Sequence, residues 1–371
     1  MKNKLVEIIT KSSPHLSWID NGMLYLCQHG SKAYNCHKED GTSDDDYKSI
    51  FIPPAKYFTG FLHTCDQIEL KAPNPDCVIY NIKKFFQLAC SANPNLLEML
   101  YVKPEYRLYV HPLMEKILEN RDKFLSTKVR FSYGGFAFDQ MRRVKLHRSW
   151  LLTKMQAPPT REEFGLPSEP VIGMENLKAA MSVVDKELDR FNFNFMEDLT
   201  NDQRIEIKNA MHEMLTNMQI FHGDLFEACA KKVNMDDNLI FILQKEREYK
   251  GKQENWRKYC DWKKNRNPER AKDEERIGFD CKFGYHIYRL YTTCKEILIE
   301  GKINVFREDR DEIMKIRRGE WTFEQLDEFV INADKELQIL YETTKILPKS
   351  PDVKFLDKLC QDIVGEKLGL I

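Results

Sequence analysis

The chain has 371 residues, and its 57 Lys and Arg nearly balance its 58 Asp and Glu, which gives a formal net charge of −1. This balance excludes a global basic field that would wrap nucleic acid, although it leaves room for a local basic patch. The hydrophobic share of 42% and the charged share of 31% are typical of a soluble globular protein. No apolar run approaches membrane-spanning length, and the N-terminal segment lacks the apolar core of a signal peptide.

Ten cysteines are scattered through the chain without a CxxC pair or a histidine at zinc-finger spacing. Most stand in apolar contexts such as LYLCQ and FFQLACS. This usage favours reduced, buried thiols, and we therefore expect a cytoplasmic protein.

Short apolar runs bounded by turn residues predict strands in the first hundred residues. They lie at Met23–Gln28, Asp46–Ile52, Asp66–Leu70 and Asp76–Tyr80. Apolar residues at helical spacing follow from Ile82 to Ala89, and Asn93 with Pro94 predicts the start of another helix that runs to Leu100. We expect a small mixed sheet covered on one side by helices.

The second half of the sequence is predominantly helical in pattern. Apolar stripes or helical texture occur at 177–191, 239–260 and 280–300, and Thr200 with Gln203 predicts a capping box. The expected class is α+β, with a small mixed-sheet domain at 1–105, a connecting segment at 106–170 and a helical domain at 171–371.

Gly30 and Ser31 follow the first predicted strand directly. A glycine at such a turn lets backbone N–H groups approach an anion closely, and a helix that starts there favours phosphate. On its own, a Gly-Ser pair carries almost no evidence.

Three aspartates, Asp44 to Asp46, lead into the second predicted strand. Residues i and i+2 of a strand share a face, so Asp44 and Asp46 are expected to point together, with Asp45 on the other side. Two adjacent carboxylates repel each other unless a cation lies between them, and Mg²⁺ is commonly held by one or two carboxylates plus substrate phosphates. Taken alone, the segment also fits a solvated acidic turn.

The combined order of strand, Gly-Ser, strand with Asp-x-Asp and a further acidic strand resembles the nucleotidyltransferases of the DNA polymerase beta superfamily. The resemblance implies that Gly30 and Ser31 bind the nucleotide's phosphates. It also implies that two Mg²⁺ ions, or Mn²⁺ in their place, are held by catalytic carboxylates. These are Asp44, Asp46 and a third residue, Asp76, with Glu69 as the alternative.

Within that superfamily the runs GSKAYN and TSDDDYKSIFIPP resemble the RNA-ligase-associated RlaP-type branch of phage and bacterial predicted nucleotidyltransferases. DCVIYNIKKFFQLACSANPNLLEML continues the likeness, with Asn93, Pro94 and Glu98 in place, and further motifs extend it from about Leu24 to Trp321. Two departures stand out. Asn35 replaces a glycine that the branch often has after Ala-Tyr, and Lys48-Ser49 replaces the usual Arg-Gly.

Lys282, His286 and Arg289 lie at i, i+4 and i+7 of a predicted helix and therefore share one face. Together with the resemblance, this spacing favours a cationic face over nucleotide phosphates, whereas an ordinary polar helix surface is the alternative. Residues 256–270 interleave aromatic and basic side chains, a pattern that fits either nucleic-acid stacking or core packing.

The function that we expect is Mg²⁺-dependent transfer of a nucleoside monophosphate from an NTP, such as ATP, to a hydroxyl acceptor with release of pyrophosphate. RNA or tRNA ends are candidate acceptors, while the acceptor, the NTP base and the oligomeric state cannot be read from the sequence. Two alternatives remain open. One is a sugar-nucleotide glycosyltransferase, and the other is a non-catalytic nucleotide- or RNA-binding protein on the same scaffold.

Overall fold

A computed structural model describes residues 1–370 except 38–43, 72–73, 171 and 191–221. By packing, the described chain divides into two compact units. The first, which we call the sheet unit, combines Met1–Leu152 with Asn267–Ile371, and the second comprises Thr153–Arg266. The class is α+β, as the sequence predicts, with a small mixed sheet in the N-terminal part and a mainly helical C-terminal region.

The sheet has five strands in the order β3-β4-β2-β1-β5. Their bounds are β1 Met23–His29, β2 Asp46–Phe51, β3 Gln67–Leu70, β4 Asp76–Asn81 and β5 Arg107–Val110. The pair β2 and β4 is parallel, and the other three pairs are antiparallel. All four strands predicted from apolar runs are confirmed to within a residue at each end.

Helices cover both faces of the sheet, so the expectation of one covered face is wrong. Side chains alternate between the faces along each strand. On one face Tyr47 and Phe51 of β2 pack with Leu5 and Ile9 of α1 (Lys2–Ser12). On the other face Ile50 joins a larger cluster formed by many of the other helices of the unit.

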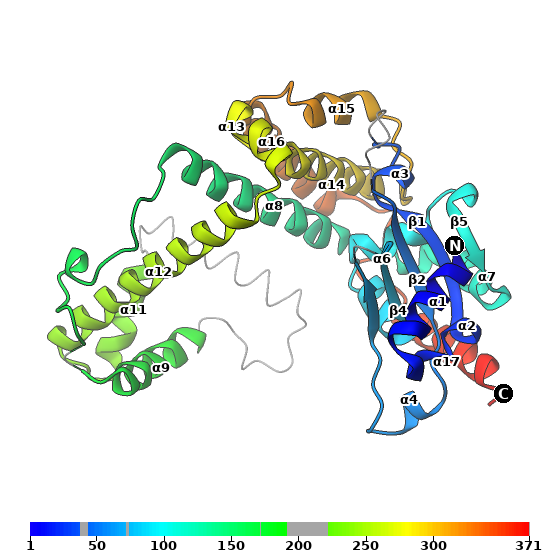
Figure 1. Cartoon of the computed structure of the whole chain (residues 1–371), viewed down its shortest axis with the longest axis horizontal. Coiled ribbons are helices and arrows are strands. Elements are labelled where there is room, and N and C mark those ends of the chain that lie inside the picture. Colours follow the sequence, from blue (N-terminus) through cyan, green and yellow to red (C-terminus); the bar gives the residue numbers. More distant parts are fainter. Residues whose placement is uncertain (38–43, 72–73, 171, 191–221, 371) are drawn as a thin grey trace. The chain divides into compact units, whose positions relative to one another are not determined.

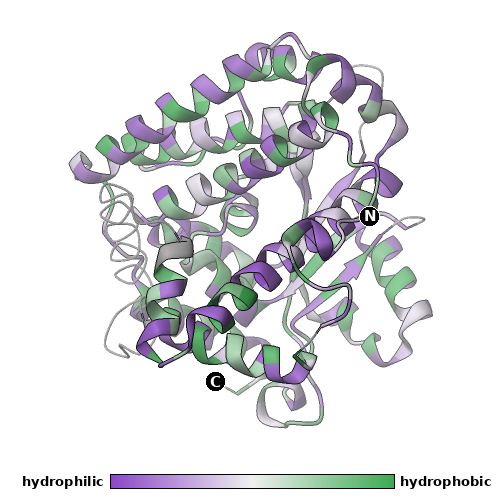
Figure 2. Cartoon of the chain, turned by 90° about the vertical axis from the view of Figure 1, so that its left-hand side faces the viewer, coloured by the Kyte–Doolittle hydropathy of each residue, from purple (hydrophilic) through white to green (hydrophobic). Residues whose placement is uncertain are grey.

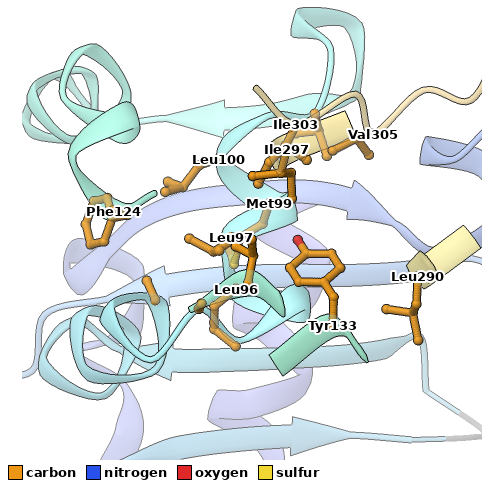
Figure 3. Close-up of a cluster of buried hydrophobic side chains, with 14 of the residues drawn as sticks. Leu96, Leu97, Met99, Leu100, Phe124, Tyr133, Leu290, Ile297, Ile303 and Val305 are labelled. Carbon is orange, nitrogen blue, oxygen red and sulfur yellow. The ribbon is translucent and has the colours of Figure 1, made fainter. Parts of the chain in front are cut away.

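The larger core joins elements that are distant in sequence. Figure 3 shows side chains of α6 (Pro94–Leu100), α8 (Val129–Leu152) and α14 (Cys281–Glu300), together with Ile303 and Val305 of the loop after α14. Tyr133 of α8 lies beside Leu97 and Met99 of α6, and Leu290 of α14 belongs to the same cluster (Figure 3). Residues 281–305 therefore belong to the same core as the sheet.

The helices of the sheet unit are mostly short before residue 120 and longer afterwards (Figure 1). Besides α1 they are α2 Ile19–Gly22, α3 Gly30–Ala33, α4 Lys56–Thr59, α5 Ile82–Cys90, α6 Pro94–Leu100, α7 Pro112–Glu119, α8 Val129–Leu152, α13 Pro268–Ile277, α14 Cys281–Glu300, α15 Arg310–Arg318, α16 Phe323–Thr343 and α17 Val353–Leu368. The predicted start of α6 is confirmed, because the Asn93 side chain accepts a hydrogen bond from the backbone N–H of Asn95 and Pro94 is the first helical residue.

The boundaries expected at residues 105 and 170 do not follow this packing. β5 lies beyond residue 105, yet it pairs with β1 and completes the sheet. α8 lies in the expected connecting segment but packs along α14. α8 buries apolar side chains such as Tyr133 and Val144, and Tyr109 and Val110 of β5 are half-buried against the cores of the same unit. No local pattern assigns these residues to one domain or another.

The second unit contains α9 (Met174–Arg190), α11 (His222–Lys232) and α12 (Asp237–Asn265) around a small apolar core. The predicted helices at 177–191 and 239–260 correspond to α9 and α12, whereas the capping box at Thr200 lies outside the described residues. Among the helices that the structure describes, none has the length and apolar character needed to cross a membrane, and Figure 2 shows hydrophilic residues interleaved along them.

Candidate active site

Asp46 and Asp76 are direct neighbours at one end of the sheet. Asp46 is the first residue of β2 and Asp76 the first of β4, and these parallel strands pair in register at the two residues. In-register residues of adjacent strands point to the same face, so both carboxylates lie on one side. Asp44 comes two residues before β2 and is exposed. Three carboxylates therefore gather at the start of two strands.

The electrostatics of Asp46 reflect this gathering. Its pKa is raised above the ordinary value of an aspartate, first by burial and then by the negative charge of Asp76. The charge of Asp44 raises the pKa further, while the ammonium groups of Lys282 and Lys48 lower it. Asp46 is thus an ionisable group whose charge is incompletely compensated by the protein.

The other acidic residues of this region are differently placed. Asp45 accepts hydrogen bonds from Lys32 Nζ at 2.6 Å and from Gln28 Nε2 at 2.8 Å. Glu69, on β3, lies opposite Val78 of β4. Its carboxylate forms an ion pair with the ammonium group of Lys71 at 3.2 Å. The placement of Asp76 beside Asp46 supports Asp76 rather than Glu69 as the third carboxylate.

The turn that contains Gly30 and Ser31 meets the carboxylates directly. His29 pairs with Asp46 in the antiparallel register of β1 and β2, so Gly30 follows at the same end of the sheet. Gly30 has φ +66°, a left-handed conformation that glycine adopts without strain. A Cβ at this position would lie 1.9 Å from Oδ2 of Asp46, so only glycine fits between the turn and this carboxylate.

The predicted cationic face of α14 reaches this end of the sheet at Lys282. Lys282 is exposed near the N-terminus of α14, and its charge acts on Asp46. His286 is half-buried one turn further, and its pKa lies well below the usual range because of burial and the nearby charges of Arg289, Lys282 and Arg317. Lys282, His286 and Arg289 therefore lie on one face of α14, as their spacing predicts.

Arg289 requires a correction of the expected role. Its side chain is buried, 6% exposed, and its Nη1 donates to Oε1 of Glu98 at 2.7 Å. A guanidinium that is buried and paired in this way holds protein groups rather than solvent-exposed phosphates. The i, i+3 and i+4 spacing shows which residues share a face but not how deep each one lies.

Residues that the sequence did not single out as a unit surround Arg289. Glu98 also accepts from the Tyr34 hydroxyl, and buried Lys48 donates to the side-chain and backbone oxygens of Asn95 at 2.8 and 2.9 Å. The only sequence signal for this group was the Asn-Pro and Glu motif at 93–98.

No three His, Cys, Asp or Glu side chains of the described residues converge closely enough to hold a metal ion as they stand. The fit of a metal ion to the three aspartates therefore depends on the chemistry of their oxygen atoms. Carboxylate oxygens are the ligands that Mg²⁺ prefers. The raised pKa of Asp46 indicates that a cation here would relieve repulsion among the three carboxylates. The donor set therefore fits a divalent cation.

This combination of sheet order, Gly-Ser turn and paired aspartates resembles the DNA polymerase beta-like nucleotidyltransferases, and the family match suggests the same class. Residues 1–160 match the model of the family described as RlaP, the RNA repair pathway DNA polymerase beta family.

One curated relative is an uncharacterized 38.9 kDa protein of the nrdC-mobD intergenic region of Enterobacteria phage T4. It is 30% identical over 109 residues, which cover 26% of this chain and 32% of that protein. The chain thus matches about a third of that relative's length. No solved structure matches the chain.

Proposed function

We propose that the chain is a Mg²⁺-dependent nucleotidyltransferase that moves a nucleoside monophosphate from an NTP to a hydroxyl acceptor and releases pyrophosphate. The observation that carries this proposal is the in-register pairing of Asp46 with Asp76 directly against the turn at Gly30. Phosphoryl transfer requires little covalent chemistry from a protein, so positioning of charge and phosphates is the main demand on the site.

Asp44, Asp46 and Asp76 are the residues proposed to hold the divalent cations. When bound, such ions neutralise charge on the phosphates and make the acceptor hydroxyl more acidic. Gly30 and Ser31 are proposed to bind the terminal phosphates, because their turn lies directly against Asp46, one of the residues proposed to hold the cations. Lys282 is proposed to add positive charge near the phosphates from α14. His286 lies one turn further along the same helix.

The reaction forms a bond between the acceptor oxygen and the α-phosphorus and breaks the bond from that phosphorus to the bridging oxygen of pyrophosphate. The hydroxyl proton must leave during this exchange. A carboxylate oxygen of Asp76, which is exposed at the start of β4, is proposed to accept it.

RNA is the acceptor class that we favour, because the matching family is described as belonging to an RNA repair pathway. Residues 256–270 are a proposed contact for such an acceptor. Tyr259 of this segment is buried, however, so any stacking would have to involve the half-buried Trp256 or Trp262.

The test is to incubate purified protein with each α-labelled NTP, Mg²⁺ and either total RNA, tRNA or an RNA-free cell extract. We expect label to enter an RNA fraction, and label in protein or small molecules would instead redirect the acceptor. The matched controls are Asp46→Asn, which should transfer nothing, and Asp45→Asn, which should transfer normally. No Mg²⁺-dependent label in any fraction, together with no NTP binding, would refute the proposed function.

A further inference from the structure

The segment Gly30–Cys36, here called the phosphate turn, is tied into the interior through Tyr34. The Tyr34 hydroxyl donates to Oε2 of Glu98 at 2.7 Å, and Arg289 Nη1 donates to Oε1 of the same carboxylate at 2.7 Å. The guanidinium of Arg289 also lies 4.0 Å from the centre of the Tyr34 ring. All three side chains are buried. One carboxylate of α6 thus joins the phosphate turn to α14.

Three further hydrogen bonds join the phosphate turn to the region after α14. The backbone N–H of Arg307 donates to the Tyr34 carbonyl at 3.1 Å, and Asn35 Nδ2 donates to the Arg307 carbonyl at 3.2 Å. The guanidinium of Arg317 donates to the Cys36 carbonyl. The phosphate turn is therefore held by residues more than 250 positions away in the sequence.

Arg307 is itself firmly fixed. Its buried guanidinium donates to Glu296 at 2.7 Å and to Asp309 at 2.8 Å, which anchors the loop after α14 to that helix. Because the Arg307 backbone is fixed to α14 in this way, its hydrogen bonds to Tyr34 and Asn35 hold these two residues in place relative to that helix. The turn cannot move away from the helix without breaking several hydrogen bonds at once.

We propose that the Glu98–Arg289 ion pair and the Tyr34 hydroxyl form a positioning unit that fixes the phosphate turn against Asp46, so that the C-terminal helices set the affinity for the nucleotide's phosphates. The proposal rests on the proposed function. A buried ion pair adds little net stability compared with apolar side chains of similar volume, because desolvation offsets the attraction. Glu98 nevertheless accepts one hydrogen bond on each carboxylate oxygen, from Arg289 and from Tyr34, and this arrangement specifies where the Tyr34 ring and hydroxyl lie.

Tyr34→Phe tests this proposal, because it removes one hydroxyl and leaves the ring. The matched control is Tyr25→Phe. Tyr25 is also fully buried in the same hydrophobic cluster, and its hydroxyl donates to the Met99 carbonyl at 2.9 Å without touching the turn. We expect similar losses of melting temperature in the two variants, so that stability cannot explain a difference in function.

Two readouts should separate the variants. Hydrogen exchange of the backbone amides of Tyr34 to Cys36, measured without nucleotide, should become faster only in Tyr34→Phe. The KM for the NTP should rise about tenfold in Tyr34→Phe with a smaller change in kcat, and stay within about twofold in Tyr25→Phe.

Equal exchange and equal KM in the two variants would overturn the positioning role. The exchange measurement does not depend on catalysis. If the wild-type protein neither binds nor turns over NTPs with Mg²⁺, the proposed function fails. In that case, faster exchange confined to Tyr34→Phe would still support the proposal that Tyr34, Glu98 and Arg289 fix the phosphate turn. Unchanged exchange in Tyr34→Phe would refute that proposal.

Discussion

The backbone of Gly30 lies directly against the carboxylate of Asp46, close enough that a Cβ on Gly30 would meet Oδ2 at 1.9 Å. The register of β1 and β2, which pairs His29 with Asp46, creates this contact. The turn and the carboxylate are consequently parts of one site.

Gly30→Ala should remove NTP binding and transfer activity. The new methyl group must displace the Asp46 carboxylate, and φ +66° is strained for alanine at a cost of about 1–2 kcal/mol of stability. The control is Gly135→Ala, since a Cβ there meets nothing within 4 Å and glycine inside a helix is unfavourable by about 1 kcal/mol. That control should melt at or above wild type with normal activity. Calorimetric titration with a non-hydrolysable NTP and thermal melts provide the comparison, and unchanged affinity in Gly30→Ala would show that the turn has only a structural role.

Asp46→Asn should abolish transfer while leaving the fold intact. The folded-state pKa of Asp46 is raised, so the ionised carboxylate destabilises the folded protein above its unfolded pKa. Replacing it with a neutral amide should therefore keep or raise the melting temperature at neutral pH without Mg²⁺.

The same variant tests metal binding without measuring activity. Mg²⁺ at ten times its dissociation constant should stabilise the wild type by about 1.4 kcal/mol and should stabilise Asp46→Asn much less. Asp45→Asn serves as the control, because Asp45 forms a half-exposed pair with Lys32 that is worth about 0–1 kcal/mol. A Mg²⁺-induced shift of equal size in Asp46→Asn and wild type would remove Asp46 from the metal ligands.

Lys282→Ala should weaken NTP binding about tenfold with little change in melting temperature, because its exposed ammonium adds charge near Asp46 but makes few packing contacts. Lys295→Ala, on the same helix, removes a lysine that pairs with Glu336 at 2.6 Å on the surface. Binding curves at low and high salt should show the loss only for Lys282→Ala, and most strongly at low salt. Equal affinities for both variants would remove Lys282 from the phosphate site.

Arg289→Ala should lower the stability of the fold, because Arg289 is paired with a buried carboxylate and not with the nucleotide. Removing one partner of a buried ion pair leaves the other charge uncompensated and costs about 3–5 kcal/mol. Here that partner is Glu98, which is 1% exposed. Denaturant unfolding should show a loss of this size for Arg289→Ala. A variant with wild-type stability but no NTP binding would restore Arg289 to the phosphate site.

The strands and the carboxylate cluster were predictable because their signals are local. Apolar runs of strand length marked the sheet, and the resemblance placed Asp76 on a neighbouring strand, where the register sets it beside Asp46. The second covered face was missed although its signal was present. Leu5 and Ile9 are one helical turn apart in α1, and this pattern is too short to distinguish from an exposed terminal segment.

The network around the phosphate turn could not be read from the sequence, because its members are far apart in the chain. Nothing local to Tyr34 or Arg307 indicates their backbone hydrogen bond. Asn35 stands where sequences of the branch that this chain resembles often have glycine, and the backbone conformation at this position explains why asparagine can replace it. Its φ is +59°, and asparagine tolerates this left-handed conformation better than most other residues.

Lys48 yields a prediction about pH. Burial lowers the pKa of Lys48 to about 8 in the folded protein, below the ordinary lysine value of 10.5. Below pH 8 the lysine is charged in both states, and the folded state bears the cost of a buried charge. As the pH rises from 8 toward 10.5, the folded state loses this proton while the unfolded state keeps it, so Lys48 contributes a gain in stability over that window.

Lys48→Met lacks this gain, and its stability relative to the wild type should therefore fall as the pH rises. The expected change in the difference between the two free energies of unfolding is about 2 kcal/mol from about pH 7 to about pH 9.5. Urea unfolding of both proteins without Mg²⁺ measures it, and taking the difference cancels the titration of the cysteines and tyrosines that they share. The hydrogen bonds from Lys48 to Asn95 persist in part when the amine is neutral, so the wild type should also keep α6 in place at high pH. A difference that stays constant across this range would mean that Lys48 remains protonated in the folded protein, held by the nearby charge of Glu98.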